Sequence, residues 1–236
     1  MPVVAAAVCP HPPILVPELA AGAAPELAPL RQACLAAVDR LTDSSPDSLL
    51  MVGSSPGPTT RYAADASGSF GPYGAPQVRV HLGAGGDDQR LPLAVLVGAW
   101  LVRQSKAAHL PTSGVTVDPT ATPAACEALG RELARTDSRV ALLVMGDGSA
   151  RRSEHAPVHL HPRAEIFDAT VATALATADS RTLAALDPDL AAELHAAGRA
   201  PWQVLAAAAG AHDWRATLLY DAAPYGVGYF VSGWER

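Results

Sequence analysis

The clearest indication of the fold in this sequence is RVALLVMGDGSA, residues 139–150. Residues 139–145 are a short, almost continuous apolar run, which is typical of a strand buried on both faces of a sheet. The Gly-Asp-Gly-Ser that follows is polar and too rich in glycine to continue the strand. A buried strand that ends in polar residues predicts an α/β protein whose ligands bind beyond the carboxyl ends of its strands.

Similar apolar runs recur along the chain, and segments with helical spacing separate many of them. The predicted strands cover residues 3–9, 48–52, 77–82, 113–118, 139–145, 214–222 and 225–233. The predicted helices cover residues 24–41, 90–105, 123–136 and 163–179, with short helical pieces up to residue 210. This alternation predicts a single α/β domain over residues 1–236, with a central mixed or mainly parallel β-sheet and helices on both faces.

Composition narrows the class of function. The net charge is −6, from 17 basic and 23 acidic residues, and no basic cluster is longer than Arg151-Arg152, so binding to nucleic acid is disfavoured. The first residues lack the pattern of a secretory signal, and no window approaches the roughly 20 apolar residues of a membrane span. Three widely spaced cysteines indicate neither a disulfide framework nor a zinc knuckle. We therefore expect a cytoplasmic protein that does not bind membranes.

His11 is the first candidate for chemistry. It follows the first predicted strand and is enclosed by Pro10, Pro12 and Pro13, which restrict its backbone. A polar side chain at the carboxyl end of a strand, on a rigid backbone, is what a metal ligand needs. The alternative is that the prolines only end the strand and that His11 is a partly exposed turn residue.

A second set of candidates lies in GDGSARRSEHAPVHLHPR, residues 146–163. His159 and His161 are two residues apart, so on an extended segment they point the same way, and with a carboxylate they suit zinc or iron. Asp147 and His155 are the candidates for acid–base catalysis. The alternative is a solvated loop whose charges pair with each other. The candidates for substrate binding are Arg151, Arg152 and Arg199, which could recognise a carboxylate if their side chains converge. The alternative is that these arginines only make the surface soluble.

Several separated pieces together resemble the LigB-like superfamily, which comprises the class III extradiol ring-cleaving dioxygenases and the Memo-like proteins. The pieces are HPP at 11–13, GDGS at 146–149, FD at 167–168, AGRAPWQVL at 197–205 and LLYDAAPYGVGYF at 218–230. Their order fits, and they span almost the whole chain. The resemblance implies an α/β sheet with a site at the strand ends, where two histidines and a carboxylate hold a metal, usually Fe(II), while a further histidine acts as acid and base.

The chain departs from that pattern at most of the expected groups. His11 matches the first ligand histidine, but Gly57 stands where the second is expected, and Ala150 stands where the catalytic histidine is expected. Glu193 is a candidate for the last ligand, with His159 and His161 as substitutes supplied by the loop. Losing an acid–base histidine alone commonly costs about 10²–10⁴-fold in rate, so conventional ring cleavage is expected to be lost.

The favoured hypothesis is therefore a LigB-like binding or partner protein with no tightly bound cofactor. Its expected partners are a small anionic or aromatic ligand, or a homo- or hetero-oligomer with a related subunit. The alternative is a metal-dependent oxygenase or hydrolase that uses Fe(II) or Zn in a site rebuilt from His11, the loop histidines and Glu193. A third hypothesis is a plain α/β domain whose cleft binds an anionic metabolite through arginines.

Overall fold

A seven-stranded sheet forms the centre of the computed structural model, which describes residues 3–83, 86 and 90–236. The strand order is β3-β6-β2-β7-β1-β9-β8. The four strands β6, β2, β7 and β1 run parallel, β3 is antiparallel to β6, and β9 is antiparallel to both β1 and β8. The strands of this sheet are β1 (Val3–Cys9), β2 (Ser48–Ser54), β3 (Thr60–Tyr62), β6 (Thr112–Val117), β7 (Val140–Met145), β8 (Arg215–Ala222) and β9 (Tyr229–Glu235).

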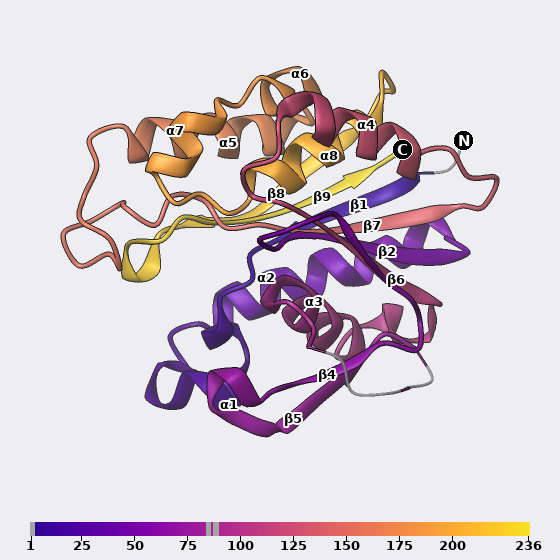
Figure 1. Cartoon of the computed structure of the whole chain (residues 1–236), viewed down its shortest axis with the longest axis horizontal. Helices are drawn as coiled ribbons and strands as arrows, with labels where there is room; N and C mark the ends of the chain where they lie inside the picture. Colours follow the sequence, from indigo (N-terminus) through magenta and orange to yellow (C-terminus); the bar gives the residue numbers. More distant parts are fainter. Residues whose placement is uncertain (1–2, 84–85, 87–89) are drawn as a thin grey trace.

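Helices cover both faces of the sheet, as Figure 1 shows. The helices α2 (Ala28–Arg40) and α3 (Leu93–Arg103) pack on one face. The opposite face carries α4 (Pro123–Leu133), α5 (Ala164–Thr177), α6 (Ser180–Ala184), α7 (Pro188–Glu193) and α8 (Arg199–Ala209). The central strands are buried on both sides, which explains their unbroken apolar runs.

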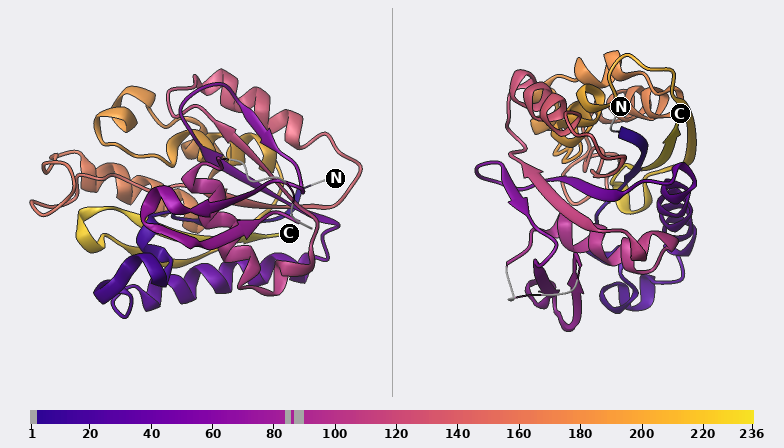
Figure 2. Two further views of the ribbon diagram at one scale, coloured as in Figure 1. Left: turned by 60° about the horizontal axis from the view of Figure 1, so that its bottom comes forward. Right: turned by 90° about the vertical axis from the view of Figure 1, so that its right-hand side faces the viewer.

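A two-stranded hairpin of β4 (Ser67–Phe70) and β5 (Ala75–His81) forms a further layer outside α3. Figure 2 shows this hairpin from two more sides. Because α3 lies between the sheet and the hairpin, residues Ala94–Val102 are all buried, and this accounts for a helix that is apolar nearly all round. The short α1 (Pro17–Ala20) and several 3₁₀ turns complete the chain.

The predicted fold class is confirmed: one mixed, mostly parallel sheet with helices on both faces. The predicted start of a helix at residue 123 is also confirmed, and the Thr122 hydroxyl caps it by accepting the Ala125 N–H at 3.2 Å. Among the helices of the described ranges, none is long and apolar enough to cross a membrane.

Some element boundaries differ from the prediction. Strand β2 continues through Gly53 to Ser54, beyond the predicted end at residue 52. Gly53 allows helix α3 to pack closely there, because a Cβ on it would lie 2.5 Å from the Ala94 Cβ. Strand β4 lies in a glycine- and proline-rich stretch and was not among the predicted strands. Strand β9 begins only at Tyr229, because Tyr225 and Gly226 have positive φ of 60° and 74° and form a turn.

Candidate functional site

His11 and Asp147 meet where the neighbouring parallel strands β1 and β7 end. The His11 backbone N–H donates to Asp147 Oδ1 at 2.7 Å, and His11 Nδ1 lies 3.8 Å from the same oxygen. The His11 side chain is 9% exposed, and its Nδ1 is buried without a hydrogen-bond partner. Asp147 therefore fixes the backbone of His11 and leaves one imidazole nitrogen free to bind something else.

The segment that precedes α8 covers this end of the sheet. Ser54 Oγ donates to the Ala197 carbonyl at 3.1 Å, and the Gly198 N–H donates to the Asp147 carbonyl at 2.8 Å. The Trp202 indole packs so closely that a Cβ on Gly198 would lie 2.2 Å from its ring. The AGRAPW stretch thus serves to dock α8 on the ends of β2 and β7.

Tyr229, at the start of β9, is a neighbour of this pair that the sequence analysis did not single out. It is buried, and burial, followed by the negative charge of Asp147, raises the pKa of its phenol. Tyr220 and Tyr225 lie near enough to add to this effect. In the sequence, the three tyrosines of LLYDAAPYGVGYF could have indicated that phenol groups lie near this site. A phenol with a raised pKa remains protonated at neutral pH and acts as a hydrogen-bond donor.

Asp168 lies beneath the Gly-Asp-Gly-Ser loop and is fully buried. Its Oδ1 accepts the Ser149 N–H at 2.8 Å, and its Oδ2 lies 3.0 Å from Arg152 Nη1. A Cβ on Gly228 would lie 2.1 Å from Oδ2, so the glycine backbone closes directly over the carboxylate. Burial raises the pKa of Asp168 to about 6, against the lowering effect of Ser149 and Arg152. Arg152 thus holds this loop in place.

The other two arginines predicted to bind substrate also donate within the chain. Arg199 is buried and donates to the Ala121 carbonyl at 2.5 Å and to Gln203 Oε1 at 2.9 Å. Arg151 donates to the carbonyls of His159 and Glu193 at 2.8 and 2.9 Å. The three arginines therefore do not converge on one site.

The loop histidines do not reach His11. His155 and His159 are exposed, and His161 Nε2 lies 3.9 Å from Glu193 Oε2, which is also paired with Arg163. In residues 3–83, 86 and 90–236, no three His, Cys, Asp or Glu side chains gather into a group that could hold a metal ion. The expected set of His11, Glu193, His159 and His161 is not assembled, because Arg151 and Arg163 hold its loop members against Glu193.

Gly57, which replaces the second histidine of the family pattern, has its own structural role. Its φ is +108°, and its N–H donates to Asp118 Oδ2 at 2.7 Å. A histidine with this backbone conformation would be strained. The loop after β2 is therefore shaped around glycine and bonded to the loop after β6.

A cavity of about 260 Å³ opens beside this loop, at the carboxyl ends of β2 and β6. The residues that line it include Tyr62, Tyr73 and Arg90, with Thr116 and several prolines. Arg90 was not among the predicted binding residues. It lies among breaker residues before α3, and only its place in the fold brings it to the strand ends.

The comparisons with known proteins bear on the fold. No protein-family model matches the chain, and no curated protein matches it. Among solved structures, the chain is similar to the "uncharacterized protein JW3007 from Escherichia coli K12", with a TM-score of 0.58 and 14% sequence identity, over 99% of this chain and 100% of that one. At this identity the likeness shows a shared fold alone.

Proposed function

We propose that this chain is a divergent LigB-like protein that binds a small anionic or aromatic molecule at the carboxyl end of its sheet and does not cleave rings in the conventional way. The main support for the proposal is the small number of possible metal ligands around His11. Its close partner is Asp147, while Gly57 and Ala150 stand at the two other expected histidine positions. A role as the non-catalytic subunit beside a related chain is a natural form of the same proposal.

The residues present do not fit the metal that the resemblance implies. The buried Nδ1 of His11 and the carboxylate of Asp147 are two suitable donors, but non-haem iron sites of this type use two histidines and a carboxylate. Among the described residues no third His, Cys, Asp or Glu joins them. The backbone of Ala150 is bonded to the Leu194 carbonyl, and its methyl group offers no acid or base. We therefore derive no reaction step through a metal.

The cavity beside β2 and β6 supports binding of an aromatic anion. Tyr62 and Tyr73 are among its lining residues, and their aromatic rings and hydroxyls suit an aromatic ligand. Arg90 also lines it, and its planar cation matches a carboxylate. A volume of about 260 Å³ lies just below the usual range of about 300–1,000 Å³ for small-molecule sites, which favours a single-ring ligand.

The test combines metal loading with ligand binding. After anaerobic incubation with Fe(II), we expect substoichiometric iron and no oxygen uptake on catechol. Benzoate should raise the melting temperature, since a ligand at a hundred times its dissociation constant adds about 2.7 kcal/mol. Arg90→Gln should abolish this shift, and Arg135→Gln, an equal charge change at an exposed residue just past the end of α4, should preserve it. Near-stoichiometric iron with oxygen uptake would refute the proposal.

The orphan nitrogen of His11 favours one alternative, a metal-dependent oxygenase or hydrolase with a rebuilt site. A buried imidazole nitrogen without a partner is unusual and suits a metal ion. In that case His11→Ala should remove bound Fe(II) or Zn. A loss of bound metal in His155→Ala would show that the exposed loop closes on the site. If His11→Ala leaves metal content unchanged, this alternative fails.

A further inference from the structure

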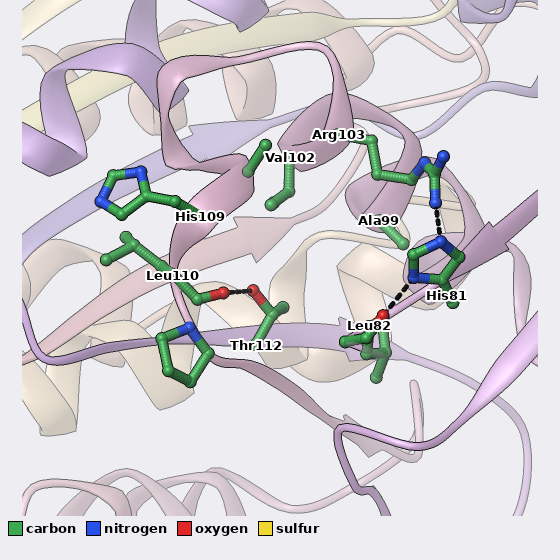
Figure 3. Close-up of a pocket in the computed structure, with 11 residues that line it drawn as sticks. His81, Leu82, Ala99, Val102, Arg103, His109, Leu110 and Thr112 are labelled. Atoms are coloured by element: carbon green, nitrogen blue, oxygen red, sulfur yellow. Dashed lines mark hydrogen bonds between the residues drawn. The ribbon is translucent and has the colours of Figure 1, made fainter. Parts of the chain in front are cut away.

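Figure 3 shows a second cavity, of about 300 Å³. It lies at the opposite end of the parallel strands from His11. One of its lining residues, Thr112, is the first residue of β6, whereas His11 follows the last residue of β1. The walls come from the end of β5, the last turn of α3 and the 3₁₀ turn Lys106–His109. The candidate ligand site described above shares none of these residues.

One side of this cavity carries a fixed positive charge. Arg103 and His81 point toward each other in Figure 3, and Arg103 Nη1 contacts His81 Nε2 while His81 Nδ1 contacts the Gly83 carbonyl. A guanidinium remains charged under all ordinary conditions, so Arg103 supplies a positive charge to this side of the cavity.

That charge has no carboxylate partner in the described part of the chain. The described ion pairs do not include Arg103, and its Nη2 and Nε make no hydrogen bond there. Asp39, an acid that contacts the nearby 3₁₀ turn, accepts the Lys106 N–H at 2.7 Å. The guanidinium thus keeps donors in a geometry that suits the two oxygens of a carboxylate.

The rest of the cavity is mainly apolar. Leu82, Ala99, Val102 and Leu110 form its walls, and the Thr112 hydroxyl is occupied by donating to the Leu110 carbonyl at 2.9 Å. Figure 3 shows Ala99 and Val102 on the wall between His81 and His109. An occupant therefore needs an anionic end for Arg103 and an apolar body for this wall.

We infer that this cavity is a second ligand site, which takes a small monocarboxylate with a short alkyl chain. The carboxylate binds the Arg103 guanidinium, and the chain covers Ala99, Val102 and Leu110. His81 orients the guanidinium by accepting one of its N–H groups. Because the cavity is small and Arg103 is exposed, the dissociation constant is on the order of 1 mM for a ligand of this size.

The experiment is an NMR titration of the ¹⁵N-labelled full chain with hexanoate at pH 7.5. Saturable amide shifts should appear at Ala99, Val102 and Leu110, and 1-hexanol and acetate should each bind at least about tenfold more weakly. Arg103→Gln should weaken hexanoate binding by roughly tenfold, and Arg103→Lys, which keeps the charge but loses the fork, by less. Arg135→Gln is the matched control and should bind as wild type.

Two results would overturn the inference. One is the absence of saturable shifts in this region up to about 20 mM hexanoate, which is some twenty times the expected dissociation constant. The other is binding that survives Arg103→Gln unchanged. Arg90→Gln separates the two sites, because it should abolish benzoate binding at the first cavity and leave hexanoate binding at the second one intact.

Discussion

Replacing Asp168 with asparagine should remove a specific pH dependence from the stability of this protein. Asp168 is 0% exposed, and burial is the largest of the effects that raise its pKa to about 6 from an ordinary 3.8. Between pH 4 and 6 the folded state therefore binds more protons at this position than the unfolded state does. Protonation stabilises the fold, so the free energy of unfolding falls as pH rises through this window and levels off above it.

The magnitude follows from the two pKa values. These two pKa values correspond to about 3 kcal/mol in all, of which about 2.4 kcal/mol falls between pH 4 and pH 7, as an upper figure for a single buried carboxyl. Asparagine keeps an oxygen that accepts the Ser149 N–H, but it does not titrate. Relative to wild type, Asp168→Asn should gain stability as pH rises from 4 to 7.

Urea unfolding at half-unit steps from pH 4 to pH 8 measures this effect. Other groups titrate in both proteins, so they cancel in the difference between wild type and Asp168→Asn. Asp213→Asn, at an exposed acid before β8, is the matched control and should keep the wild-type slope. A difference that is flat over pH 4 to 7, or that runs in the opposite direction, would refute the assignment of Asp168 as a destabilised buried carboxylate.

Three substitutions test the packing around the site by urea unfolding at pH 7.5. Gly198→Ala should cost about 2–3 kcal/mol, because its Cβ would overlap the buried Trp202 ring, whereas Gly233→Ala, with no atom within 4 Å, should cost far less. Arg199→Met should cost about 2 kcal/mol by leaving the Ala121 carbonyl without its donor, and a neutral result would contradict its structural role. Thr122→Ala should cost about 1 kcal/mol through loss of the α4 cap.

Much of the fold could be predicted from local sequence. The apolar runs of β1 and β7 are long enough, and their polar ends sharp enough, to place His11 and Asp147 at the same edge of a parallel sheet. Thr122 and Pro123 mark a helix start through chemistry that acts within a few residues. Periodicity and capping are local effects, so a single sequence reveals them.

The partners of the polar side chains could not be predicted in the same way. Arg152 reaches Asp168, 16 residues away, and Arg199 reaches the Ala121 carbonyl, 78 residues away. The residues next to an arginine in the sequence do not show whether its guanidinium binds a substrate or forms hydrogen bonds between two loops. Only the packing of α5 and α8 on the sheet decides between these roles, and that depends on the whole chain.

The hydrogen bonds of Arg152 and Arg199 show which arginines stabilise the fold and which ones are left to bind a ligand. The sequence suggested that these arginines bind a substrate, but Arg152 pairs with a buried carboxylate and Arg199 donates to half-buried carbonyls. Removing either should therefore destabilise the fold more than it alters binding. Arg90 and Arg103 line cavities instead and are exposed. Their replacement should therefore change ligand binding while leaving the free energy of unfolding within about 0.5 kcal/mol of wild type. A larger loss of stability in Arg90→Gln or Arg103→Gln would show that these arginines, too, belong to the scaffold.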